Sequence, residues 1–197
     1  MDCQYSLTLS AAPAAEPLTT AQAKAHLVID SSFTDDDTLI DSYIKAARQH
    51  VEDVTGRQIY TATWVLRMDA FPPTILLPKP PLSSITSLAY VDSAGSAQTL
   101  TADEDYSLDA YSVPARIVPY VGCSWPSTYG HINDVTVTYV AGYGTSESSF
   151  PAPILHAMRL LIADLYEHRE ESVVQISITA RRAVDALLAP YIVYEGI

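Results

Sequence analysis

The spacing of apolar residues changes twice along the chain, and these changes constrain the fold more than any other feature. Between Leu39 and Val54 the apolar residues recur with the period of one helix face. From Tyr60 to Met68 they occupy every second position, which is the period of a strand. The helical period returns after Pro153. The sequence therefore predicts an α+β fold in which a β region is inserted between two helical segments.

The first helical segment is expected to cover residues 18–56. Thr19 and Gln22 have the spacing of a capping box, which predicts a short helix to about Val28. Thr34 is expected to cap a longer helix, because the carboxylates at 35–37 would then lie beside the positive end of its dipole. Gly56 follows at the position where a glycine commonly ends a helix.

The β region is expected to cover residues 57–141. Further strands are predicted at 74–77, 85–91, 115–118 and 135–140. Proline pairs at 72–73 and 80–81 interrupt this pattern and mark turns. Because proline lacks a backbone donor, this density favours the edge strands of a small antiparallel sheet or sandwich over a parallel core.

The second helical segment is expected to cover residues 150–189. Pro153 suits the first position of a helix. The apolar stripe from Ile154 to Tyr166 is broad enough to pack on the earlier long helix. A short last helix is predicted from Thr179 to Ala189, just before a proline. Together the N- and C-terminal segments predict an antiparallel helical bundle.

The two ends of the chain have different compositions. Residues 1–17 finish in an alanine- and proline-rich stretch and are interpreted as an N-terminal arm. Residues 190–197 are unusually apolar, and their large side chains are Tyr191, Ile192, Val193, Tyr194 and Ile197. These side chains either fold back on the core or extend to a partner's groove or sheet edge. The second interpretation makes them a docking tail that stays mobile until a partner buries it.

The charge of the chain limits its partners. A formal net charge of −12 argues against direct binding of duplex DNA or RNA, because phosphate neutralisation needs a basic face. An acidic surface still suits a channel wall past which DNA slides. The sequence has neither a run of about 20 apolar residues nor a signal peptide, so cytoplasmic synthesis is expected. Cys3 and Cys123 are too far apart to suggest a metal cluster, and we expect inert thiols.

The sequence contains no pattern typical of an active site or a cofactor site. The acidic runs at 35–37 and 103–105 lack the glycine and distal glutamate of a calcium loop. The histidines do not have the His-Glu-x-x-His spacing, and Gly142 and Gly144 lack the lysine of a phosphate loop. A Gly-x-Ser-x-Gly elbow is also missing. We therefore expect a structural protein with no enzyme activity, no cofactor and no metal.

Two pairs of charged residues oppose the dipoles of their predicted helices. Glu170 and Glu171 lie at the carboxyl end of one helix, and Arg181 and Arg182 lie in the first turn of the next. They are either solvated, or paired across the turn within one subunit, or paired with an adjacent copy. The last interpretation makes these four residues a subunit interface.

Several segments follow one another in a distinctive order. They are the paired helices before Gly56-Arg57, the strand start Tyr106–Asp109, Trp125-Pro126, the strand end Ala141–Gly144, the helix entry Phe150–Pro153 and the run Tyr166–Glu170. In this order and spacing they resemble the phage head–tail connector proteins, a family also found in gene transfer agents. The resemblance covers Leu18 to about Leu188 and depends on order and spacing rather than on one motif.

This resemblance implies an adaptor that assembles into a ring of about twelve copies beneath the portal, in the neck of a virion. Such a ring extends the DNA channel without binding DNA specifically and offers a docking surface to the next head-completion or tail protein. The apolar C-terminal side chains would bind the portal. An alternative of another class is a β-sandwich module on a helical stalk, which binds carbohydrate or protein through exposed Trp64, Trp125, Tyr120 or Tyr129.

Overall fold

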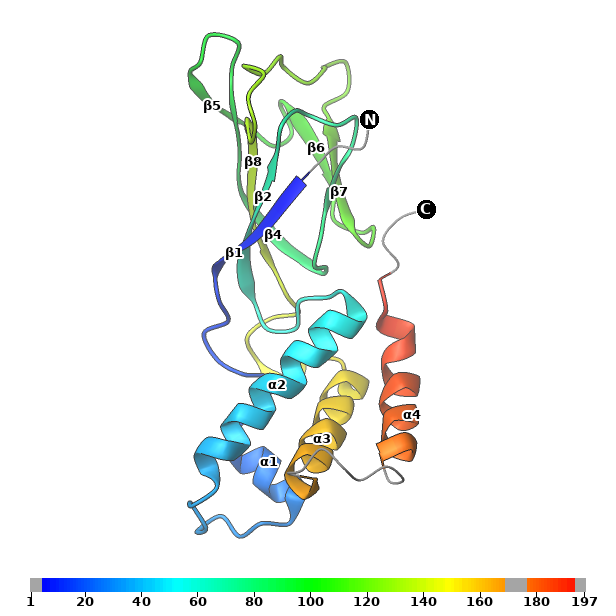
Figure 1. Cartoon of the computed structure of the whole chain (residues 1–197). Helices are drawn as coiled ribbons and strands as arrows, with labels where there is room; N and C mark the ends of the chain where they lie inside the picture. The colour runs from blue at the N-terminus through cyan, green and yellow to red at the C-terminus, as the bar shows by residue number, and fades with distance from the viewer. Residues whose placement is uncertain (1–4, 169–176, 194–197) are drawn as a thin grey trace. The chain divides into compact units, whose positions relative to one another are not determined.

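The computed structural model describes residues 5–168 and 177–193. The chain forms two compact units, each assembled from separated parts of the sequence (Figure 1). We call them the β unit, residues 1–14 and 61–143, and the helical unit, residues 15–60 and 144–197. The presence of both helices and strands confirms the predicted α+β class.

The described strands of the β unit form two sheets. The five-stranded sheet has the order β1-β2-β8-β4-β5, where the strands are β1 (Tyr5–Ala11), β2 (Ala62–Met68), β8 (Val135–Ala141), β4 (Leu82–Val91) and β5 (Ala97–Leu100). The three-stranded sheet has the order β3-β7-β6, with β3 (Ile75–Leu77), β7 (Ala115–Pro119) and β6 (Tyr106–Asp109). Each ladder between named strands is antiparallel, as the sequence predicts.

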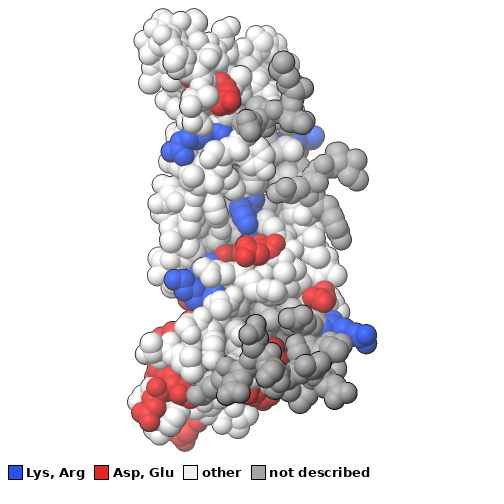
Figure 2. All heavy atoms as spheres, in the orientation of Figure 1, with Lys and Arg blue, Asp and Glu red and all other residues white. Residues whose placement is uncertain are grey.

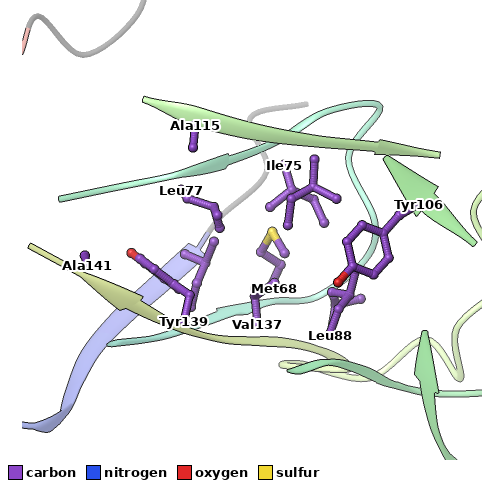
Figure 3. Close-up of a cluster of buried hydrophobic side chains, with 12 residues drawn as sticks. Met68, Ile75, Leu77, Leu88, Tyr106, Ala115, Val137, Tyr139 and Ala141 are labelled. Atoms are coloured by element: carbon purple, nitrogen blue, oxygen red, sulfur yellow. The ribbon is translucent and has the colours of Figure 1, made fainter. Parts of the chain in front are cut away.

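The two sheets pack face to face around an apolar core (Figure 3). The period-two pattern of β8 directs Val137 and Tyr139 inward, where they are fully buried. Ile75 and Leu77 meet them from the three-stranded sheet. The Tyr139 hydroxyl donates a hydrogen bond of 2.8 Å to the carbonyl oxygen of Pro78, and burial raises the pKa of this tyrosine. The inserted region is therefore a sandwich with a core of its own.

The first residues form a strand, which differs from the N-terminal arm expected from the sequence. β1 pairs with β2 along its length. Leu7 packs against the sandwich core, whereas Tyr5 and Leu9 remain about half exposed because β1 is an edge strand. The alternation of these three residues is the sequence signal for the strand. The four residues of β5 carry only one large apolar side chain, so periodicity does not predict that strand.

The helical unit contains α1 (Thr20–Leu27), α2 (Asp37–Thr55), α3 (Ala152–Glu167) and α4 (Ser177–Leu188), with short 3-10 turns η1 (Glu147–Ser149) and η2 (Ala189–Tyr191). α3 contacts α1, α2 and α4, and α1 also contacts α2. Ile154, Met158 and Ile162 form the buried face of α3, which confirms the predicted apolar stripe.

The predicted start of one helix is confirmed and that of another is wrong. Thr19 and Gln22 form a complete capping box at α1. α2, however, begins only after Asp36 and is not capped by Thr34. The Asp36 carboxylate accepts a hydrogen bond of 2.7 Å from the Tyr166 hydroxyl on α3. A tertiary contact therefore uses a side chain that the sequence pattern assigns to the helix dipole.

A buried ionic network joins α2 to the chain on both sides of it. Arg48 is 6% exposed and donates from Nε to Glu16 and from Nη1 to Glu52, both at 2.6 Å. Glu52 also accepts hydrogen bonds from the Gln58 side chain at 2.7 Å and from the Ile59 amide at 3.1 Å. Burial alone lowers the pKa of Arg48, but its hydrogen bonds and charge interactions with the two glutamates raise it overall. The network holds the segments that enter and leave α2.

Candidate functional site

The C-terminal residues singled out by the sequence lie partly against the end of α2. Tyr191, Ile192 and Val193 are half-buried. The Val193 amide donates a hydrogen bond of 2.8 Å to the carbonyl oxygen of Thr55. For these first residues of the tail, the contacts correspond to folding back rather than to a mobile tail. Tyr194 and Ile197 lie outside the described residues.

The residues that hold the tail are not indicated by the sequence pattern. Arg57 donates from Nε to the carbonyl oxygen of Tyr191 at 2.6 Å. Gly56 ends α2 in the left-handed conformation, with φ of +68°, as its predicted role requires. A Cβ at this glycine would lie 3.6 Å from the Cβ of Val193. The end of α2 therefore also binds the first residues of the tail. Of the residues involved, only the glycine could have been singled out from the sequence.

The structure describes one side chain of the expected subunit interface. Arg182 is exposed on α4. Arg181 belongs to the same helix, but its side chain, together with Glu170 and Glu171, lies outside the described part of the structure. Pairing among these four residues stays a prediction.

A cavity of about 570 Å³ lies between α2, α3 and α4. Most of its wall is apolar, and the polar side chains on it are His50, Asp164 and Asp185. Asp164 already lies 3.3 Å from the Nδ1 atom of His168. The apolar wall residues are Ala46, Ala47, Val54, Leu160, Leu161, Leu165 and Val184. Such a wall suits apolar contacts between helices and offers no Ser or Cys nucleophile.

The aromatic residues proposed for a binding platform do not share one environment. Trp125 stacks on Phe71 with ring centroids 4.7 Å apart, and it packs against the sandwich core. Trp64 also packs against that core and has the Lys79 ammonium 6.0 Å from its ring centre. Both tryptophans are therefore committed largely to packing, whereas Tyr129 remains 51% exposed.

The described residues contain neither a metal site nor a membrane-spanning helix. No three His, Cys, Asp or Glu side chains in this part of the chain gather closely enough to hold a metal ion. No helix within it is long and apolar enough to span a membrane. Cys123 is exposed with a free thiol.

Solved structures of gene transfer agent (GTA) particles contain chains similar to this one. A chain in the neck of an empty GTA particle, computed with C6 symmetry, is 23% identical with a TM-score of 0.81, covering 98% of this chain and 97% of that chain. One in the neck of a native GTA particle, computed with C12 symmetry, is 25% identical with a TM-score of 0.75 over 98% and 97%. One in the virion of a native particle is 24% identical with a TM-score of 0.77 over 97% of each chain.

Comparison with a family model agrees with the structural likeness, although no match is found among curated protein sequences. The model of one family, described as phage gp6-like head-tail connector protein, matches residues 18–120, which is just over half of the chain. The match includes α1, α2 and most of the β unit. The chain therefore belongs to the phage gp6-like head–tail connector family, whose members are structural virion proteins and not enzymes.

Proposed function

We propose that this protein is a neck adaptor that forms a ring beneath the portal, extends the DNA channel and supplies a docking surface for the next head-completion or tail protein. The observation that carries the proposal is the likeness over nearly the whole chain to chains of GTA necks, one of them solved with C12 symmetry. Family membership supports the same role. On this proposal the protein is made in the cytoplasm of the bacterial host and ends in the virion neck.

The charge of the chain suits a channel wall. Ring closure by rotation uses one heterologous interface repeated around the axis. Twelve copies of a chain with net charge −12 carry a formal charge of roughly −140. Such a ring repels the phosphate backbone, so DNA passes without specific binding.

We assign portal binding to the apolar tail, Tyr191, Ile192, Val193, Tyr194 and Ile197. The hydrogen bonds of Tyr191 to Arg57 and of Val193 to Thr55 fix the first half of the tail at the end of α2. Anchoring of this kind lowers the conformational entropy that the remaining residues lose when they bind a partner.

Deleting residues 194–197 tests the tail, because it removes two proposed portal contacts and keeps both backbone anchors. We expect an unchanged Tm in the free protein and at least tenfold less adaptor on purified heads. Glu195→Ala is the matched control in the same segment and should bind heads normally. Normal adaptor content on heads with the truncated protein would show that the tail is dispensable.

The four charged residues near α4 are proposed to pair between adjacent copies. Arg181→Glu combined with Arg182→Glu should prevent ring assembly and leave the monomer's Tm nearly unchanged, since exposed ion pairs contribute only about 0–1 kcal/mol to folding. Adding Glu170→Arg and Glu171→Arg should restore assembly. The size of the assembly, measured in solution and on heads, shows whether assembly is lost and then restored. A large fall in the Tm of the monomer would instead indicate pairing inside one subunit.

A further inference from the structure

Four loops of the β unit meet at one end of the sandwich, and we call this surface the loop end. They cover residues 69–74, 92–96, 101–105 and 120–134. The Asn133 amide donates a hydrogen bond of 2.9 Å to the Asp69 carboxylate, and the Tyr120 amide donates one of 3.0 Å to the carbonyl oxygen of Asp105. Residues 92 and 128 form an isolated bridge. The long loop 120–134 is thus tied to the other three.

The loop end exposes large apolar side chains to solvent. Val121 is 88% exposed and Ile132 is 78% exposed, although both are β-branched residues that favour buried strands. Tyr129 and Tyr120 are 51% and 39% exposed in the same loop. Several large apolar side chains on one loop, rather than single ones scattered over the surface, are typical of an interaction site.

The charges of the loop end all have one sign. The four loops contain six Asp and Glu residues and no Lys or Arg. Asp103 and Glu104 are exposed at the tip of their loop. The nearby Arg67 lies on β2, and its guanidinium donates to the Thr8 hydroxyl at 2.9 Å. In Figure 2, the end of the sandwich that carries these loops shows red and white atoms on the face in view.

Hydrogen bonds to carboxylates hold the loops in shape. Asp134, which is 5% exposed, accepts bonds from the amides of Gly130 at 2.6 Å and His131 at 2.8 Å. The Asp105 carboxylate accepts one of 2.7 Å from the Thr101 amide. A surface fixed in this way loses little conformational entropy on binding, so its exposed apolar groups are available for a partner at low cost.

We propose that the loop end binds the next head-completion or tail protein through a surface of that protein which is apolar at its centre and rich in Lys and Arg around it. The inference deepens the proposed function and rests on it. Charge complementarity selects this occupant, because opposite potentials steer and orient partners. A second copy of the chain binding through its own loop end is disfavoured, since each copy carries the same excess of carboxylates at this end.

The test uses particles assembled with the variant Val121→Asp combined with Ile132→Asp. Both side chains are exposed, so the free protein should keep its Tm. We expect heads to retain the adaptor at the wild-type level and the fraction of tailed particles to fall at least tenfold. Immunoblotting of purified heads measures the first quantity and electron microscopy the second.

Tyr111→Asp is the matched control, because Tyr111 is 99% exposed in the β6–β7 hairpin, at the opposite end of the three-stranded sheet from residues 101–105. It should leave tailing unchanged. If the double variant does not fold, Asp103→Lys combined with Glu104→Lys replaces it, with the same expected loss of tails.

Three results would overturn the inference: normal tailing of the loop-end variants, loss of the adaptor itself from heads, or an equal loss of tails with Tyr111→Asp. Failure of the proposed function is a separate result, since wild-type particles would then lack this protein in the neck.

Discussion

At the scale of single residues, Arg48 is a buried charge of the helical unit whose removal should be costly. Its guanidinium is buried between Glu16 and Glu52, and removal of one partner of a buried ion pair leaves an uncompensated charge. Arg48→Ala should therefore lower the free energy of unfolding by about 3–5 kcal/mol. Chemical denaturation followed by circular dichroism measures the change.

Lys45→Ala is the control for this prediction, because Lys45 is exposed on the same helix. It should change the unfolding free energy by no more than about 0.5 kcal/mol. Equal changes in the unfolding free energy for the two substitutions would mean that the ionic network contributes nothing to stability.

At the scale of elements, the pairing of β1 with β2 makes the first residues part of the sandwich rather than a free arm. Leu7 packs against the core, whereas Ser6 lies on the outer face opposite Arg67 of β2. Leu7→Asp should lower the free energy of unfolding by about 2 kcal/mol or more, because it places an unpaired charge against apolar surface. Ser6→Asp should change it by less than about 0.5 kcal/mol. If neither substitution changed the free energy of unfolding, residues 1–17 would form a free arm.

The sequence predicts the elements whose pattern is regular and local. The stripe on α3 and the alternation of β8 are long enough for their period to be read, and both elements form as expected. The predicted cap of α2 at Thr34 is wrong, and Asp36 of the expected first turn instead accepts a hydrogen bond from Tyr166, which is distant in sequence. The site follows the same rule: an apolar tail is visible in the sequence, but its contact with Arg57 depends on the fold.

At the scale of the whole molecule, each compact unit takes residues from separated stretches of the chain. The β unit combines residues 1–14 with the insertion, residues 61–143, whereas the helical unit combines the segments on either side of the insertion, residues 15–60 and 144–197. The apolar tail, which we propose binds the portal, belongs to the helical unit. The loop end, which we propose binds the next head-completion or tail protein, belongs to the β unit. A ring adaptor needs two such surfaces, because it joins the portal to a different protein.

The central claim is tested most directly by electron cryomicroscopy of purified particles that contain this protein. The account predicts density that fits the chain between the portal and the tail, repeated about twelve times around the particle axis. Density for this chain only at the tail tip or on the outer surface of the capsid would contradict it.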